Sequence, residues 1–421
     1  MTTLLQRDWN RFWFSLRPGT TLGLFRIALG SIIFAWCLLL VPDLNTWYSE
    51  NGIMPVAAMH VWNANPCAFD LLSTVTNFKI TIAAMALLMI SALFVAAGYQ
   101  TRISQVVMYA LLLSFQHRDM LILNGGDSLQ RNMAFLILFA DSGAACSVDR
   151  LIRIRKGLEL ASDTPMVEVW PQRLMQLQLM AVYLSTFLSK IQGPEWQNGT
   201  ALYFALHYTE LRRFPLFGLR NQPWFYQFFT YLTLVTEFSL GSLIWNRRLR
   251  PYILLMGCGL HLGVEYAMTV PLFSFTMFAS YINFVDDAWI DALRRWAPRQ
   301  FARARLLLGD SMRLDPRDRE LLATLNCLNL VQISPQGAPA PDASLLRRAL
   351  WRCPGVWLFV LGPAALTLYI IPIKWFLVPF AVVWPIATAI LVQRFAAAMA
   401  ARAASTAPAD APRAGDVSLA A

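Results

Sequence analysis

The chain has 421 residues and a formal net charge of +10, and 57% of its residues are hydrophobic whereas only 14% are charged. A soluble domain usually carries about 25% charged residues, so this composition excludes an ordinary soluble protein. The basic surplus follows the alternation of membrane loops described below, and we expect no nucleic-acid partner.

Apolar segments occur in blocks long enough to cross a bilayer, which takes about 20 mostly apolar residues per helix. No cleavable signal peptide is evident, so the first block is expected to be retained. Crossings are predicted, in chain order, at residues 21–41, 80–97, 103–123, 129–140, 173–189, 226–245, 251–268, 270–285, 356–373 and 375–393. The sequence therefore predicts an all-α integral membrane protein, a polytopic bundle of about ten transmembrane helices.

The distribution of arginine and lysine predicts the orientation of this bundle. Three arginines precede the first crossing, the loop 42–77 has no Lys or Arg, and the loop 286–354 holds eleven Arg. The positive-inside rule then places both termini in the cytoplasm. The exception is the outer loop 191–225, which contains Arg212, Arg213 and Arg220. We expect a multi-pass protein of a bacterial inner membrane.

Four regions follow from this topology. Residues 1–285 are predicted to form one transmembrane domain, 286–354 a cytoplasmic amphipathic insert and linker, 355–395 a C-terminal transmembrane helix pair, and 396–421 a disordered tail rich in Ala, Pro and Ser. Within the insert, Trp289 to Leu308 is interpreted as a basic amphipathic helix on an anionic membrane surface or as an ordinary surface helix.

Ionisable groups inside a spanning helix cost about 2.5–3.5 kcal/mol each, so each needs a reason. Most of them lie in the outer half of this predicted bundle, which favours a cavity opening away from the cytoplasm. Tyr183, Thr186 and Lys190 share one face of the fifth helix. His261 and Glu265 share a face of the seventh. The alternatives are a Lys190 that snorkels to the interface and a structural pair of His261 with Glu265.

Two further observations concern contacts between helices. Arg26 and Glu237 lie deeper, toward the cytoplasmic half, and they are predicted to form a structural ion pair that joins the first helix to the sixth. Gly259 and Gly263 form a small-xxx-small pattern that is typical of a helix contact. The six cysteines form no C-x-x-C or Cys/His cluster, so no metal site is predicted.

Several short motifs, in this order and spacing, resemble the HTTM (horizontally transferred transmembrane) domain over about residues 5–285. They are Leu22-Gly23-Leu24-Phe25-Arg26-Ile27, Trp47-Tyr48-Ser49-Glu50-Asn51-Gly52, Asn124-Gly125-Gly126-Asp127-Ser128-Leu129, Lys190 followed by Gly193-Pro194-Glu195-Trp196, Gly199-Thr200-Ala201-Leu202-Tyr203, and His261-Leu262 with the Phe-rich segment from Leu272 to Phe284.

The best-known proteins with this domain are the vitamin K-dependent γ-carboxylases, which carboxylate Glu side chains in a reaction driven by oxygenation of a reduced quinone. The resemblance implies that Lys190 corresponds to their base, that His261 is similar in placement to a histidine near the quinone, and that a reduced quinone is a cofactor. The carboxylases carry a histidine about where Asp127 stands, and a large lumenal C-terminal region that differs from the sequence after residue 285.

Two functions follow as hypotheses. The first is a carboxylase-like or oxygenase-like enzyme, a lyase or an oxidoreductase, that acts on a quinol or another lipophilic molecule. Its catalytic residues are predicted to be Lys190, His261 and Glu265, and its substrate-binding residues Tyr183, Thr186, Trp196 and Asp127, with Trp196 in a lid over the amine. The second is a non-enzymatic membrane protein that assists maturation or export of a partner, or moves a small solute.

Overall fold

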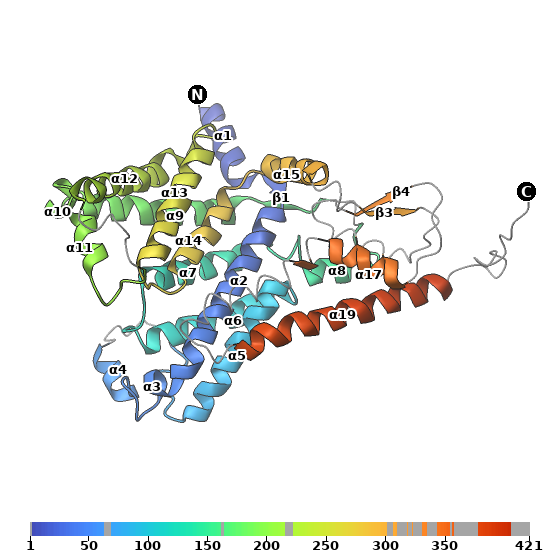
Figure 1. The fold of residues 1–421 in the computed structure, drawn as a ribbon, viewed down its shortest axis with the longest axis horizontal. Coiled ribbons are helices and arrows are strands. Elements are labelled where there is room, and N and C mark those ends of the chain that lie inside the picture. The colour runs from blue at the N-terminus through green and yellow to red at the C-terminus, as the bar shows by residue number, and fades with distance from the viewer. Residues whose placement is uncertain are drawn as a thin grey trace, which may run out of the picture. The chain divides into compact units, whose positions relative to one another are not determined.

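The computed structural model describes residues 2–62, 69–160, 164–214, 222–300, 306–309, 318, 322, 331–334, 343–353, 356–357 and 378–405 (Figure 1). The chain divides into two compact units. The first comprises Met1–Asp149 with Pro165–Val285, and the second Arg150–Thr164 with Asp286–Ala421. Each unit is described by itself.

The first unit is built almost entirely from helices (Figure 1). Its α-helices are α1 (Thr2–Phe14), α2 (Thr20–Leu40), α3 (Leu44–Tyr48), α4 (Val56–Trp62), α5 (Phe78–Ala97), α6 (Thr101–Arg118), α7 (Gly125–Leu136), α9 (Trp170–Lys190), α10 (Pro194–Gln197), α11 (Ala201–His207), α12 (Pro223–Ser242), α13 (Arg250–Ala267) and α14 (Phe273–Tyr281). The 3-10 helices η1 (Val41–Asp43), η2 (Ile137–Phe139), η3 (Leu243–Trp245) and η4 (Ile282–Phe284) continue four of them. Helix α8 (Val148–Arg155) begins at the end of this unit.

A short pair of strands connects the beginnings of two long helices. Strand β1 (Leu16–Pro18) pairs antiparallel with β2 (Met166–Glu168), and Leu16 lies opposite Glu168. Helix α2 follows β1 directly and α9 follows β2. The strand pair therefore brings the beginnings of α2 and α9 together, although the two helices are far apart in the sequence.

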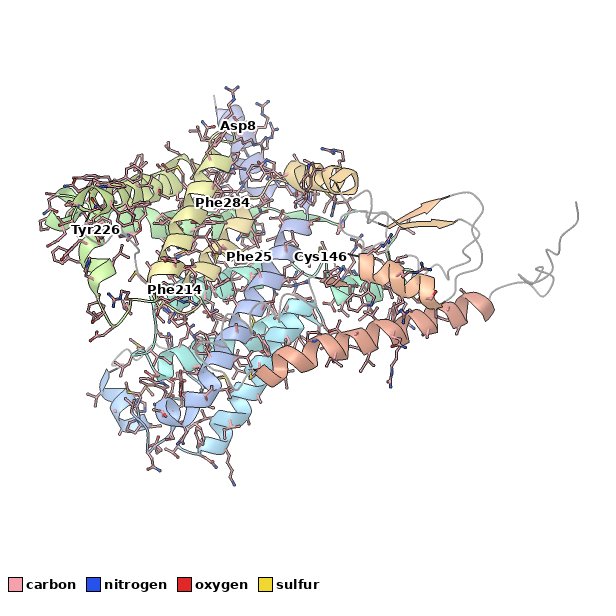
Figure 2. The ribbon with its side chains drawn as sticks, in the orientation of Figure 1. Asp8, Phe25, Cys146, Phe214, Tyr226 and Phe284 are labelled. Atoms are coloured by element: carbon pink, nitrogen blue, oxygen red, sulfur yellow. The ribbon has the colours of Figure 1, made fainter. Side chains whose placement is uncertain are left out.

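Small residues allow the long helices to approach closely. A Cβ atom added to Gly30 of α2 would lie 2.7 Å from the backbone nitrogen of Ala96 on α5. A Cβ added to Gly241 of α12 would lie 2.9 Å from the backbone nitrogen of Leu184 on α9. The interior beside these crossings is filled by large apolar side chains such as Phe25 and Phe284, which are fully buried (Figure 2).

Four helical segments in the described residues are long and apolar enough to cross a membrane: Thr20–Tyr48, Phe78–Ala97, Pro223–Trp245 and Pro385–Ala403. The predicted crossings at 173–189 and 251–268 coincide with the helices α9 and α13, which carry more polar groups and are not among these four segments. Helix α14 has 9 residues, or about 14 Å at 1.5 Å per residue, against a hydrocarbon core of about 30 Å. The four long apolar segments nevertheless make this the structure of an α-helical membrane protein.

The predicted ion pair between Arg26 and Glu237 is wrong. The guanidinium group of Arg26 is fully buried and donates to the backbone oxygen of Ser142 at 3.1 Å and of Cys146 at 2.6 Å. Cys146 marks this turn in Figure 2. Glu237 pairs instead with Lys190. The reason is the packing order of the helices, because α2 borders the turn at residues 142–147 whereas α12 packs on α9.

The second unit contains α15 (Asp287–Gln300), the parallel strands β3 (Leu306–Gly309) and β4 (Val331–Ser334), α17 (Ala343–Arg352) and α19 (Val378–Ser405). Helix α15 lies within the predicted amphipathic insert. The predicted crossing at 356–373 lies outside the described residues, apart from 356–357.

Helix α19 extends to Ser405, well into the segment that was expected to be disordered. Alanine, which is abundant there, has the highest intrinsic helix propensity. Ala396, Met399 and Ala403 are also buried, and the first two pack in a core with α17. Tertiary packing thus stabilises a segment whose composition suggested a tail, and residues 406–421 lie outside the described residues.

Candidate functional site

Lys190, at the C-terminal end of α9, forms an ion pair with Glu237 in the C-terminal half of α12. The Lys190 side chain is 28% exposed and that of Glu237 is 7% exposed, so the carboxylate is the more deeply buried partner. Gly241 lies one turn beyond Glu237 and lets α12 contact the backbone of α9 at Leu184. This helix crossing brings the two charges together.

The loop after α9 covers the amine of Lys190. The Nζ atom lies 5.0 Å from the centre of the Trp196 ring on α10, in a cation–π contact. The Tyr231 hydroxyl of α12 donates to the backbone oxygen of Gln197 at 2.9 Å. Gly199 has a φ angle of +80°, which a glycine adopts without strain. The structure thus places Trp196 over the amine, and Tyr231 holds the covering loop in place.

Next to this pair lies a buried chain of hydrogen bonds between three aromatic side chains. The Tyr183 hydroxyl of α9 is 2.7 Å from Nε2 of His261 on α13 and 2.5 Å from the hydroxyl of Tyr281 on α14. The three residues are only 3%, 3% and 5% exposed. The other ring nitrogen of His261, Nδ1, is buried and has no hydrogen-bond partner among the described residues.

A glycine on α13 makes room for this chain. A Cβ atom added to Gly257 would lie 2.5 Å from the Tyr281 hydroxyl oxygen, so a larger residue there would displace Tyr281. Gly259 and Gly263, which were predicted to form a helix contact, have nothing within 4 Å of an added Cβ atom. That contact is therefore absent from the described part of the chain, because α13 packs through its Gly257 face.

The ion pair and the hydrogen-bonded chain belong to one cluster. Glu237 lies within electrostatic range of Tyr183 and Tyr281, and Lys190 lies within range of His261. Thr186, the remaining polar residue on this face of α9, donates to the backbone oxygen of Tyr183 at 3.0 Å. We call Lys190, Glu237, Tyr183, His261 and Tyr281 the polar cluster.

Glu265, which was predicted to be catalytic or to pair with His261, has another partner. Its carboxylate forms an ion pair with Arg213 of the loop before α12, and both side chains are largely buried. Backbone bonds from Arg213 to Ala267 and from Thr269 to Leu211 fix the same loop to the end of α13. Tyr183 contacts the imidazole ring in place of Glu265. Glu265 in turn neutralises Arg213, one of the three arginines that were the exception in the predicted outer loop 191–225.

Asp127, which was predicted to bind substrate, caps a helix. Its carboxylate accepts a hydrogen bond from the backbone nitrogen of Asn124 at 2.7 Å, and the Asn124 side chain accepts one from Gly126 at 2.7 Å. This reciprocal capping box satisfies two backbone donors at the beginning of α7. The helix end therefore accounts for the backbone hydrogen bond of Asp127, and the side chain of Trp36 on α2 forms a further hydrogen bond with the carboxylate.

Sequence reasoning missed one member of the polar cluster and mispaired another. Tyr281 stands in a Phe-rich segment, where nothing distinguishes it from its neighbours until the fold places its hydroxyl against Gly257. Glu237 was singled out as a buried charge but given the wrong partner. Among the described residues, no group of three or more His, Cys, Asp or Glu side chains is arranged to hold a metal ion.

The first unit contains apolar helices long enough to cross a membrane, and α9, α12, α13 and α14 contribute a buried polar cluster to it. The protein is therefore an α-helical membrane protein with polar side chains in its interior. The chain belongs to the HTTM domain family, whose model matches residues 15–289, and the resemblance drawn from the motifs is confirmed. It is similar to the sporulation-delaying protein SdpB of Bacillus subtilis (strain 168), with 24% identity over 296 residues that cover 67% of this chain and 85% of SdpB. No solved structure matches the chain.

Proposed function

We propose that the chain is a multi-pass enzyme of a bacterial inner membrane that removes a proton from a lipophilic hydroxyl compound such as a reduced quinone. The observation that carries this proposal is the Lys190–Glu237 ion pair beside the buried chain of Tyr183, His261 and Tyr281. The alternation of basic and non-basic loops supports a multi-pass topology with both termini in the cytoplasm.

The residues present fit an aromatic molecule with hydroxyl groups. His261 Nδ1 is a buried polar atom without a partner among the described residues, and such an atom is costly unless a ligand or water satisfies it. The rings of Phe273 and Phe278 have their centres 5.4 and 6.2 Å from that of His261, so the surroundings are aromatic. A reduced quinone supplies hydroxyl protons and reducing equivalents when bound. His261 would bind one of its oxygens.

The ion pair, rather than the lysine alone, would act as the base. An ammonium beside a carboxylate and a neutral amine beside a carboxylic acid are two forms of one protonation state of a coupled pair. In the second form the neutral amine of Lys190 accepts the proton of a hydroxyl group, and the product is an ammonium beside a carboxylic acid. A guanidinium does not release its proton to Glu237, so an arginine at position 190 removes this base. The ammonium of Lys190 then stabilises the oxyanion that remains when the O–H bond breaks.

Mass spectrometry of the small molecules that co-purify with the gently solubilised protein tests this function. We expect a quinone in the parent protein, loss of that quinone in His261→Ala, and its retention in Lys190→Arg. The arginine keeps the positive charge, but it does not release its proton and so cannot act as a base. Quinol-dependent oxygen uptake should disappear in Lys190→Arg and persist in Lys79→Arg, the same change at the exposed beginning of α5. A parent protein that retains no quinone and takes up no oxygen contradicts the proposal.

A second candidate is a non-enzymatic membrane protein that assists maturation or export of a partner, or moves a small solute. The observation that favours it is that Lys190 and Glu237 satisfy each other's charge within the chain, as a structural pair would. The same preparation separates the two functions. A co-purifying polypeptide, no bound quinone, and full function of Lys190→Arg in cells would support the second candidate.

A further inference from the structure

The second unit contains a basic helix that lies beside an apolar one. Helix α17 packs one face on α19 through Leu346, Ala349, Leu350 and Cys353, which are buried in one core with Val392, Ala396 and Met399 of α19. Arg347 and Arg348 occupy the opposite face of α17 and are exposed. The packing therefore fixes which way the two arginines face.

The exposed face of α19 changes character along its length. Ile386, Ile390 and Leu391 are 55%, 48% and 59% exposed, as expected of side chains that contact lipid tails. Arg394, one turn beyond Ile390 on the same face, is exposed and charged. The large apolar side chains of the exposed face thus end near Val392, inside the apolar stretch Pro385–Ala403 and at the end of the crossing predicted from the sequence at 375–393. Helix α17 packs on the stretch from Val392 to Met399, just beyond that end.

Two tryptophans lie where α17 ends. The ring centres of Trp351 and Trp357 are 5.4 Å apart, and the indole nitrogen of Trp357 donates to the backbone oxygen of Trp351 at 2.6 Å. Trp357 is 43% exposed. Tryptophan is enriched at the level of the lipid headgroups, where its apolar ring and polar N–H are both accommodated. The tryptophan pair therefore favours a position of α17 at the membrane interface.

We infer that the exposed face of α17 binds anionic phospholipid headgroups, with Arg347 and Arg348 as the residues that contact the phosphates. The end of the apolar face of α19 sets the depth at which α17 lies in the membrane, and the Trp351–Trp357 pair anchors α17 at the level of the headgroups. The two arginines supply positive charge that is complementary to an anionic leaflet. Arginine also binds phosphate oxygens with two parallel hydrogen bonds. This surface belongs to the second unit, whereas the polar cluster belongs to the first, and the inference does not depend on the proposed enzyme function.

Binding of short-chain phosphatidylglycerol and phosphatidylcholine to the detergent-solubilised full chain, measured by native mass spectrometry, tests the inference. We expect tighter binding of phosphatidylglycerol, and a loss of roughly 30-fold in that affinity in Arg347→Gln/Arg348→Gln, from about fivefold per arginine near an anionic surface. The matched control is Arg247→Gln/Arg248→Gln, which removes the same charge from the exposed turn before α13 and should keep the parent affinity.

Equal affinity for the two lipids, or equal losses in the two double variants, would overturn the inference. Arg347→Lys/Arg348→Lys keeps the charge, so it should still prefer phosphatidylglycerol. If the glutamine variant does not fold, the same measurement is made on the parent protein in 0.5 M salt. Salt screens exposed charges, so we expect it to abolish the preference for phosphatidylglycerol. A preference that persists at that salt concentration would rule out an electrostatic headgroup site.

Discussion

Glu237 on α12 forms its ion pair with Lys190 on α9, 47 positions earlier in the chain. The carboxylate is 7% exposed and the lysine 28%, so this is a charge pair buried on one side and open on the other. Each charge lowers the cost of burying its partner, and each therefore depends on the other. The pair connects two helices that also contribute to the polar cluster.

Removing one partner of this pair should lower the stability of the protein strongly, whereas removing both should lower it only a little. We expect Lys190→Met to destabilise the solubilised protein by roughly 3 kcal/mol, because Glu237 is left as a buried, uncompensated charge. Lys190→Met/Glu237→Met should recover most of the loss in melting temperature. Lys79→Met, at an exposed position, is the control. A single variant that melts like the parent protein would show that the pair is not buried in the working protein.

Gly257 should not tolerate an added methyl group. In Gly257→Ala the new Cβ would lie 2.5 Å from the Tyr281 hydroxyl oxygen, and this overpacking should cost about 1–3 kcal/mol. Gly263→Ala on the same helix is a matched control, because nothing lies within 4 Å of its added Cβ, and the higher helix propensity of alanine should leave it as stable or more stable. Thermal unfolding in detergent compares the two, and equal melting temperatures would contradict the placement of Tyr281 against α13.

Arg26 and Glu237 should act independently, since they have separate partners. Arg26→Met leaves the backbone oxygens of Ser142 and Cys146 without their donor and should destabilise the protein by about 2–3 kcal/mol. Combined with Glu237→Gln, its effect on the melting temperature should add to that of the second change, as is usual for residues without shared partners. A double variant that is more stable than Arg26→Met alone would indicate that Arg26 and Glu237 interact directly, which contradicts the structure.

Tyr231 should control access to the amine of Lys190. In Tyr231→Phe the loop loses the hydrogen bond to Gln197, worth about 1 kcal/mol, so Lys190 should react roughly fivefold faster with a small acylating reagent. Peptide mass spectrometry of the solubilised protein measures the modification at residue 190. Tyr252→Phe, at a side chain that is 68% exposed, should not change the rate. An unchanged rate in Tyr231→Phe would show that the covering loop is held by other contacts.

The proposed orientation predicts which cysteines are reached from outside the cell. Cys67, in the outer loop, should react with an impermeant thiol reagent added to intact cells, whereas Cys146 should not. Cys67 and Cys327 lie outside the described residues. Cys353 is fully buried, so its failure to react carries no information on topology. Labelling of Cys146 but not Cys67 in intact cells would reverse the orientation.

The sequence by itself determined the class of protein, the family and several candidate residues. Apolar content and helical periodicity are local properties, so α2, α5, α9, α12 and α13 follow from runs of residues that are contiguous in the chain. The motifs around Arg26, Asp127 and Lys190 are local too, and they identified the HTTM domain. Lys190 and His261 stood out because a polar side chain in an apolar helix needs a reason.

Only the tertiary structure decided which side chain meets which. Tyr183 and Tyr281 are 98 positions apart, and their hydrogen bond depends on a helix crossing that Gly257 permits. Glu237 pairs with Lys190 rather than with Arg26 for the same reason, because Gly241 allows α12 to pack closely on α9. Periodicity gives the face on which a residue lies, but the packing of backbones at small residues selects the neighbour across from it.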